Sequence, residues 1–203
     1  MIKGKIITVE GIDGAGKSFF IDYIKDSLKN FKRFKVLYQR EPGGTEIGEQ
    51  IRKLLLTQDM LPMTELLLYL GSRYEAVNKV YLPHLKSEKS LLLLDRFLDS
   101  SIIYQGIGRK LSVQLIIDIH KMIKIYLQPT LTLLFYCDLE IVKQRNKKNN
   151  LDRIEKMGDV FFNELQQSYL KIAKENKERV VVIDNSESVE STKNQINQAL
   201  INI

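Results

Sequence analysis

The stretch from Lys5 to Ser18, KIITVEGIDGAGKS, decides the fold of this chain. KIITVE (5–10) is short, apolar and rich in β-branched residues, so it predicts a buried strand. GIDGAGKS (11–18) matches G-x-x-x-x-G-K-[ST], the pattern of a phosphate-binding loop, and helical spacing of apolar residues follows from Lys17. The glycines let backbone N–H groups point at an anion, and the N-terminus of the following helix adds positive charge. A chance match in a surface turn is the alternative, and the flanking strand and helix argue against it.

This loop supplies the candidate residues for binding a nucleoside triphosphate. We expect the Lys17 ammonium to contact the β- and γ-phosphates and the Ser18 hydroxyl to bind Mg²⁺. The predicted ATP-binding residues of the loop are Gly11, Asp13, Gly14, Ala15, Gly16, Lys17 and Ser18.

The rest of the chain alternates between strand and helix patterns. Apolar strands are predicted over 5–10, 35–39, 91–95, 130–138 and 179–184. Helices are predicted over 17–30, 46–56, 63–88, 113–126, 139–177 and 189–201. This order favours an α/β fold, a five-stranded parallel sheet flanked by helices in one domain covering 1–203. Ligands bind at the carboxyl ends of such strands, so motifs that follow different strands are expected to converge.

Composition narrows the cellular setting and the partners. The 203 residues are 44% hydrophobic and 28% charged, as in ordinary globular proteins, and no apolar run is long enough to cross a bilayer. The single Cys and the absence of a signal peptide at the N-terminus predict a cytoplasmic protein. The net charge of +6 suits nucleic acid, an anionic membrane or small anions, or is simply a basic surface. Because no basic block interleaves with aromatics, we expect neither a nucleic-acid nor a membrane partner.

Several further motifs follow the predicted strands. REPGGT (40–45) follows the second, DRFLDSS (95–101) and YQGIGR (104–109) follow the third, and LDRIE (151–155) follows the fourth. The base-recognition tetrad N-K-x-D of GTPases is absent, which weakens a GTPase reading. Together with GIDGAGKS, these segments resemble the bacterial thymidylate kinases, in order and over nearly the whole chain.

The resemblance implies a P-loop NTPase fold with a short lid at about 145–157. It further implies transfer of the ATP γ-phosphoryl group to dTMP, giving dTDP in dTTP synthesis, with Mg²⁺, and a homodimer. Two alternatives stay open. One is a P-loop kinase for another nucleotide or nucleoside, and the other is a non-catalytic regulator that binds ATP.

Charged residues at the predicted strand ends suit the chemistry of phosphoryl transfer, which needs positive charge and alignment. Arg96 has a fork that can hold a monophosphate, although a surface ion pair with Asp95 or Asp99 is the alternative. Asp95 is placed as a metal-positioning carboxylate would be, or is a strand-end cap. Arg40 is predicted near the acceptor phosphate, or pairs with Glu41.

The resemblance assigns the acceptor site residue by residue. It implies that Tyr69 stacks on thymine and that Arg73, one helical turn later, donates to the base O4. Packing within the helix is the alternative for both. Asp13 is implied to face the sugar hydroxyl and the metal shell, or is a plain turn residue. Ser101 is implied near N3 and Tyr104 against the sugar, and the motif containing Tyr104 brings Gln105 into the predicted substrate site.

The segment RNKKNNLDR (145–153) is polar and rich in cations, as a closing lid would be. The phosphate loop lacks the arginine that some thymidylate kinases carry, so we expect Arg153 to reach the γ-phosphate and Arg145 to support the ATP end. Lys147 and Lys148 are further candidates, and a solvated basic loop is the alternative.

Some positions depart from the family pattern or carry no predicted chemistry. Phe97 stands where a tyrosine is usual, Ser72 where an aspartate is frequent, and Asn149-Asn150 where an Arg-Gly pair is frequent. His84 and His120 have no metal-ligand spacing and are expected to be surface or packing residues. Cys137, at a strand end, is expected in the core.

Overall fold

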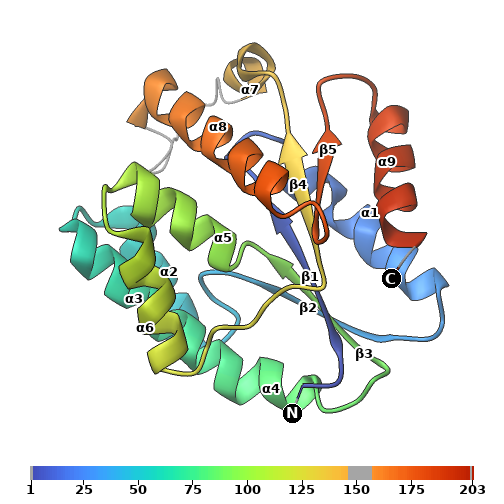
Figure 1. Cartoon of the computed structure of the whole chain (residues 1–203), viewed down its shortest axis with the longest axis horizontal. Coiled ribbons are helices and arrows are strands. Elements are labelled where there is room, and N and C mark those ends of the chain that lie inside the picture. Colours follow the sequence, from blue (N-terminus) through green and yellow to red (C-terminus); the bar gives the residue numbers. More distant parts are fainter. Residues whose placement is uncertain (1, 146–156, 202) are drawn as a thin grey trace.

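The computed structural model describes residues 2–145, 157–201 and 203. Its centre is a parallel sheet of five strands in the order β2-β3-β1-β4-β5. The strands are β1 (Lys5–Glu10), β2 (Lys35–Arg40), β3 (Ser90–Asp95), β4 (Leu131–Tyr136) and β5 (Val180–Asp184). Helices cover both faces of the sheet (Figure 1). The predicted α/β class, the five strands and their parallel arrangement are therefore confirmed.

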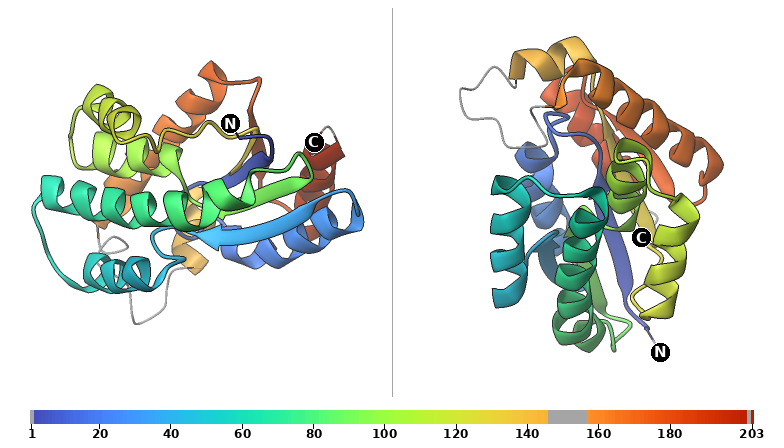
Figure 2. Two further views of the ribbon diagram at one scale, coloured as in Figure 1. Left: turned by 90° about the horizontal axis from the view of Figure 1, so that it is seen from below. Right: turned by 90° about the vertical axis from the view of Figure 1, so that its left-hand side faces the viewer.

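The helical elements, in chain order, are α1 (Lys17–Asn30), α2 (Glu46–Thr57), α3 (Pro62–Ala76), the π-helical η1 (Val77–Tyr81), α4 (Leu82–His84), α5 (Leu98–Ser101), the π-helical η2 (Ile102–Gly108), α6 (Val113–Met122), α7 (Leu139–Arg145), α8 (Asp159–Glu175) and α9 (Val189–Ile201). In Figure 1, α1 and α9 lie together on one side of the sheet and α8 lies on the other. In both views of Figure 2, α2 and α3 lie side by side at one end of the molecule.

Three helix predictions need correction. The single helix expected over 63–88 is α3, η1 and α4 in succession, with a wider turn in the middle. The helix expected over 113–126 ends at Met122, because Lys124 adopts a left-handed backbone with φ 59°. The stretch expected to be helical over 139–177 contains α7 and α8, with 146–156 outside the described residues.

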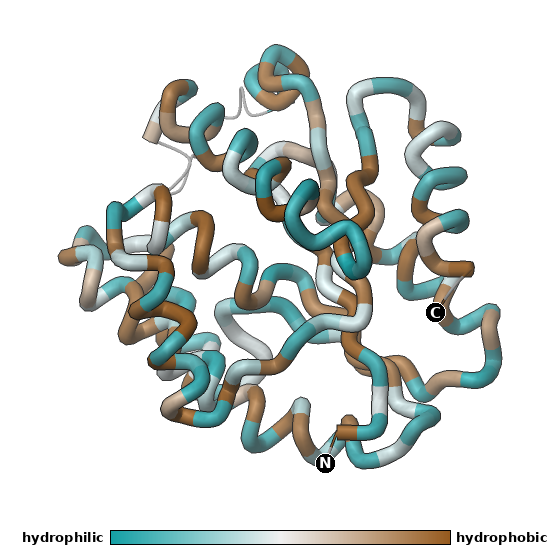
Figure 3. Tube along the Cα trace, viewed as in Figure 1, coloured by the Kyte–Doolittle hydropathy of each residue, from teal (hydrophilic) through white to brown (hydrophobic). Residues whose placement is uncertain are grey.

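Continuous burial explains why the sequences of the central strands are apolar runs. In β3 the residues from Ser90 to Leu94 are all buried, and β1 is buried from Ile6 to Glu10. A strand with both faces covered by helices has no solvent side, so its sequence does not alternate. Figure 3 shows the hydrophobic stretches gathered along the central strands.

The strand registers bring the carboxyl ends of the sheet together. Asp95 at the end of β3 lies opposite Val9 of β1 and Arg40 of β2, and Glu10 lies opposite Leu134 of β4. The segments that follow these strands therefore start at one edge of the sheet, as predicted.

Gly11 allows the phosphate loop to turn directly at the end of β1. Its φ is 132°, and a Cβ at this position would lie 2.4 Å from the carbonyl oxygen of Phe135 in β4. A side chain here would clash with backbone, so the close approach requires glycine.

Candidate active site

Two neighbouring cavities open at the carboxyl edge of the sheet. Side chains from α3, α5 and η2 line the first, here called the inner cavity, and its residues include Tyr69, Arg73, Ser101, Tyr104 and Gln105. The second, here called the loop cavity, lies at the phosphate loop, and its residues include Gly14, Lys17, Ser18, Asp95 and Arg145. The two cavities share four lining residues: Asp13, Glu41, Arg52 and Arg96. A ligand in one cavity would thus meet a ligand in the other at two arginines.

Arg96 is fixed at the boundary between these cavities. Its Nη1 donates to the carbonyl oxygen of Gly11 at 3.1 Å and to Ser100 Oγ at 3.3 Å, and its Nη2 forms an ion pair with Asp13. Its backbone is left-handed, with φ 68°, which is uncommon for a residue other than glycine and is frequent at functional sites. The ion pair that the sequence left open with Asp95 or Asp99 is not formed; Asp99 pairs with Arg179 instead.

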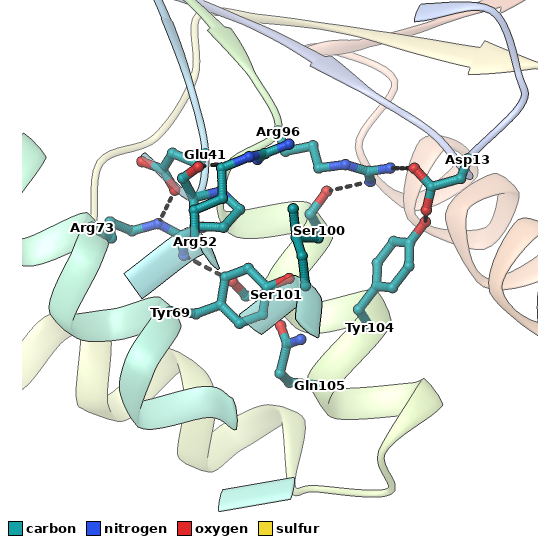
Figure 4. A pocket seen from close by; sticks show the side chains of 12 residues that line it. Asp13, Glu41, Arg52, Tyr69, Arg73, Arg96, Ser100, Ser101, Tyr104 and Gln105 are labelled. Carbon is teal, nitrogen blue, oxygen red and sulfur yellow. Dashed lines mark hydrogen bonds and ion pairs between the residues drawn. The ribbon is translucent and has the colours of Figure 1, made fainter. Parts of the chain in front are cut away.

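Asp13 is held between a cation and a phenol. Besides Arg96, it accepts a hydrogen bond from the Tyr104 hydroxyl at 3.0 Å (Figure 4). Burial alone would raise its pKa, but Arg96 and then Lys17 outweigh burial and lower the pKa of the Asp13 carboxyl. Asp13 is therefore an ionised group that orients two residues of the inner cavity, and it is more than a turn former.

Lys17 lies buried beside Arg96. Its ammonium donates to the carbonyl oxygens of Gly11 at 2.9 Å and Ile12 at 2.7 Å, so Lys17 and Arg96 share the Gly11 oxygen. Burial, and then the charge of Arg96, lower the pKa of Lys17 to about 8. Two cations this close favour a shared anion between them.

The loop cavity contains groups that fit a magnesium ion. Asp95 Oδ1 is buried and has no hydrogen-bond partner within the described part of the chain, and the exposed Ser18 lines the same cavity. In nucleotide sites Mg²⁺ takes one or two protein oxygens together with phosphate oxygens and water. The lack of a cluster of three or more His, Cys, Asp or Glu among the described residues is compatible with such a site.

Arg73 lies buried at the far end of the inner cavity (Figure 4). Its Nε donates to Glu41 at 2.6 Å, and its Nη1 donates to Ser101 Oγ at 2.9 Å. Tyr69, one turn earlier on α3, lines the same cavity, as the shared helix face predicts. The structure thus brings Tyr69, Arg73 and Ser101 together, with Tyr104 and Gln105 nearby.

Arg40 and Arg52 occupy different places. Arg40 is partly exposed, pairs with Glu49 at 2.8 Å rather than with Glu41, and lines only the loop cavity. Arg52 of α2 donates to the carbonyl oxygen of Pro42 at 3.1 Å and lines both cavities. Arg52 was missed by the sequence analysis, because nothing in a helical sequence distinguishes an arginine that faces a cavity from one that faces solvent.

At the lid, Arg145 is the only predicted residue within the described part of the chain. It donates from Nη1 to Gly14 at 3.5 Å and from Nη2 to the carbonyl oxygen of Asn185 at 3.3 Å, so it lies beside the phosphate loop. Arg153, Lys147, Lys148 and the Asn149-Asn150 pair lie outside the described residues. The assignment of Arg153 to the γ-phosphate stays a prediction.

The comparisons with known proteins decide the family. A family model described as thymidylate kinase matches residues 9–196. The chain belongs to the thymidylate kinase family. The thymidylate kinase of Nitrosospira multiformis is 40% identical over 207 residues, covering 100% of this chain and 99% of the relative. That of Ligilactobacillus salivarius is 38% identical over 195 residues and covers 93% of both chains.

A solved structure agrees with this assignment. The crystal structure of thymidylate kinase from Ehrlichia chaffeensis is 28% identical, has a TM-score of 0.77 and covers 97% of this chain and 98% of that chain. The predicted P-loop NTPase fold is therefore confirmed. Thymidylate kinases are phosphotransferases, so this member of the family is an enzyme. Within the described residues, no helix is both long and apolar enough to span a bilayer.

Two positions that depart from the thymidylate kinase pattern have clear structural roles. The Phe97 ring is fully buried and lies 4.8 Å from the Arg73 guanidinium carbon, so a phenol here would need a buried partner. Ser72 Oγ accepts a hydrogen bond from the backbone N–H of Gly43 at 3.1 Å and so holds the loop after β2.

Buried polar residues behind the site were not predicted. Asn185, after β5, donates from Nδ2 to the carbonyl oxygen of Ala15 at 2.8 Å and so supports the phosphate loop. Glu10 accepts hydrogen bonds from the backbone N–H of Phe97 at 2.7 Å and from the hydroxyls of Ser100 and Tyr169. Glu10 therefore ties the end of β1 to the segment that carries Arg96.

Glu10 is expected to make the stability of the protein depend on pH. Burial, and then the negative charge of Asp99, raise its pKa from 4.5 to about 7. A carboxyl group with a raised folded-state pKa makes no pH-dependent contribution below about pH 4.5, and it destabilises the fold increasingly as pH rises from there to about 7. At about 1.4 kcal/mol per pKa unit, this shift costs on the order of 3 kcal/mol of unfolding free energy at high pH. Glu10→Gln should remove this pH-dependent cost.

The measurement is urea unfolding of the wild type and Glu10→Gln at pH 5 and pH 8. The variant should lose less stability than the wild type between these two values. His120, whose pKa is lowered, acts in the opposite direction but is common to both proteins, so their difference isolates Glu10. An equal loss in the two proteins would show that Glu10 titrates normally.

Proposed function

We propose that this protein transfers the γ-phosphoryl group of ATP to dTMP. An oxygen of the dTMP phosphate forms a bond to the γ-phosphorus, the bond between that phosphorus and the β,γ-bridging oxygen breaks, and dTDP and ADP result. The observation that carries the proposal is the set of four residues shared by the inner and loop cavities. ATP in the loop cavity and dTMP in the inner cavity would meet there end to end, as in-line transfer requires.

The protein residues contribute charge and position. Lys17 binds the β- and γ-phosphates, and Arg96, already fixed by Asp13 and Gly11, binds the acceptor phosphate where the two ligands meet. Arg52 adds a second cation at the same boundary, and Arg40 and Arg145 lie further along the loop cavity. These groups are held before the ligands arrive, so little reorganisation is needed at the moment of transfer.

Ser18 and Asp95 would hold the magnesium ion. When bound, the ion neutralises negative charge on the β- and γ-phosphate oxygens. The buried, unpartnered oxygen of Asp95 supports this assignment.

The inner cavity suits a thymine base and a deoxyribose. Arg73 and Ser101 can donate hydrogen bonds to a base carbonyl such as O4, whereas cytosine has an amino donor at that position and would leave these groups unpaired, at a cost of about 1–3 kcal/mol. Tyr69 offers a ring for stacking on the base, and Gln105 also lines the inner cavity. Tyr104, held by Asp13, is assigned to the sugar, where it would disfavour a 2′-hydroxyl.

The decisive test is an ADP-release assay with a panel of acceptors. We expect dTMP to have the highest kcat/KM, followed by dUMP, with ribo-TMP and dCMP at least tenfold lower. Preference for dCMP, UMP or a nucleoside would replace dTMP with another acceptor. If the protein binds ATP but phosphorylates none of the acceptors, the result would favour the alternative of a non-catalytic regulator that binds ATP.

We also propose a homodimer through the outer face of α2 and α3. Ile47, Leu54, Leu67 and Tyr74 are exposed on these helices, which is more apolar surface than a solvated helix pair needs. Light scattering after size-exclusion chromatography should give twice the mass of one chain, and Leu67→Asp should give the monomer. A monomeric wild type would exclude the dimer. The cytoplasmic location stays a prediction.

A further inference from the structure

Four residues from three segments of the chain hold the guanidinium of Arg73. Nε is bound by Glu41 after β2, and Nη2 donates to the carbonyl oxygen of Phe97 at 2.9 Å. Nη1 donates to Ser101 Oγ at 2.9 Å and contacts His120 Nε2 of α6 at 2.6 Å. An arginine has five N–H donors in a rigid plane, so these contacts use four of them and leave one Nη2 hydrogen for a ligand.

The contact with His120 requires one particular form of the imidazole. Nδ1 of His120 lies 2.7 Å from the carbonyl oxygen of Ile116, one turn earlier in α6. A carbonyl oxygen only accepts, so Nδ1 carries the hydrogen. Nε2 of a neutral ring is then bare and accepts the hydrogen bond from Arg73. A charged imidazole would place a second cation against the guanidinium. Both of its nitrogens would carry hydrogens, so neither could accept the hydrogen bond from Arg73.

The surroundings keep His120 in this neutral form. The side chain is fully buried, and burial, followed by the charge of Arg73, lowers its pKa to about 4. Arg73, from α3, is the charged group in contact with the ring. The carboxylate of Glu41 binds the Nε of Arg73 at 2.6 Å, whereas the histidine ring contacts Nη1 of the same guanidinium.

His120 does not line the inner cavity and acts on it from behind Arg73. Without the imidazole, Glu41 and Phe97 would still hold the Nε and Nη2 positions, but Ser101 alone would hold Nη1. Ser101 lines the cavity and is itself a candidate to bind the base. The guanidinium and the Ser101 hydroxyl would both be freer to turn, so the pattern of donors presented to the base would be less defined.

We infer that His120 is a positioning residue for recognition of the acceptor base: its bare Nε2 fixes the plane of the Arg73 guanidinium, and with it the donors that face a base carbonyl in the inner cavity. This inference rests on the proposed function. It gives a role to a histidine that the sequence analysis treated as a packing residue.

The first test is a kinetic comparison of His120→Leu with His120→Gln. Leucine fills the space without an acceptor, whereas the glutamine amide oxygen can take the place of Nε2. For His120→Leu we expect the KM for dTMP to rise about tenfold, the effect of losing about 1.4 kcal/mol, and the preference for dTMP over dCMP to fall by a similar factor. The KM for ATP should stay within about twofold, because His120 lines neither cavity. His120→Gln should recover most of the loss, because its amide oxygen can accept the hydrogen bond from Arg73.

The matched control is His84→Leu. His84 contacts the carbonyl oxygen of Leu91 at 3.2 Å and lines neither cavity, so its replacement should leave the KM for dTMP unchanged. A His120→Leu enzyme with the KM and base preference of the wild type would overturn the inference. If instead the wild type fails to phosphorylate dTMP, it is the proposed function that fails.

A second measurement needs no folded His120→Leu protein. The chain has two histidines, so ¹⁵N spectra of the imidazoles can be assigned with the His84→Leu variant. At pH 7, His120 should show a protonated Nδ1 and an unprotonated Nε2, and the Nε2 signal should shift when dTMP is added. The inference would be overturned by a proton on Nε2, by a charged ring, or by an Nε2 signal that does not shift when dTMP is added.

Discussion

Arg96→Lys should lower kcat/KM for dTMP phosphorylation about a thousandfold, the effect expected when a preorganised donor to the transferring group is lost. Arg96 makes three interactions at once, with Gly11, Ser100 and Asp13. A lysine ammonium keeps the charge but cannot reproduce a planar fork that holds both the loop and a phosphate. The backbone at Arg96, with φ 68°, also directs the side chain toward the boundary between the cavities.

Steady-state kinetics with ATP and dTMP would measure this effect. Most of the loss should appear in kcat, because Arg96 is assigned to the place where charge moves during transfer. The control is Arg33→Lys, the same replacement at an exposed arginine that lines neither cavity, and it should leave kcat/KM unchanged. An Arg96→Lys enzyme within about fivefold of the wild type would show that its charge alone matters and that the fork geometry does not.

The sequence predicts the parts of this molecule that short segments encode. The strand KIITVE and the loop GIDGAGKS need only local information, because burial on both faces and the glycine spacing are visible in a few residues. The strand has the predicted bounds, and the helix after the loop begins at Lys17 as predicted. The segment 102–108 was missed as a helix, because a π-helical turn has no distinct hydrophobic period.

The supporting contacts of the site could not be predicted in the same way. Asn185 lies 170 residues from its partner Ala15, and Arg96 lies 83 residues from Asp13. Pairings over such distances depend on strand order, which the sequence left open. His120 shows the limit most clearly: a lone histidine on a helix looks like a packing residue until the structure reveals that Arg73 is what it packs against.

Arg73→Leu should destabilise the fold by about 3–5 kcal/mol at pH 8, because it leaves the Glu41 carboxylate buried without its cation. Arg73 and Glu41 are both almost fully buried, and their Nε and Oε2 atoms are 2.6 Å apart. Among the residues that the structure describes, the Tyr81 hydroxyl, at 3.1 Å, is the other side-chain donor to Glu41. A single neutral hydroxyl cannot replace a guanidinium as a partner for a buried charge.

Arg73→Leu should destabilise the fold less at pH 5 than at pH 8, because of how Glu41 titrates. Burial already raises the pKa of Glu41 in the wild type although Arg73 opposes the shift, so removing Arg73 must raise it further. A carboxyl with a raised folded-state pKa destabilises the fold only above its unfolded-state pKa, and increasingly so as pH rises through the folded-state value. Protonation at pH 5 thus relieves part of the cost of the unpaired charge.

The double variant Arg73→Leu/Glu41→Gln separates this explanation from a simple loss of packing. Glutamine keeps the shape of Glu41 and an oxygen that accepts from Tyr81, but carries no charge to leave unpaired. Urea unfolding of both single variants and the double variant should show the double variant more stable at pH 8 than Arg73→Leu alone. Suppose instead that the double variant and Arg73→Leu are equally unstable at pH 8, and that Arg73→Leu loses as much stability at pH 5. The destabilisation would then come from the cavity that the arginine leaves, and not from an unpaired charge. Recovery in the double variant would show that the base-recognition residue also neutralises a buried charge, so the two roles of Arg73 cannot be changed independently.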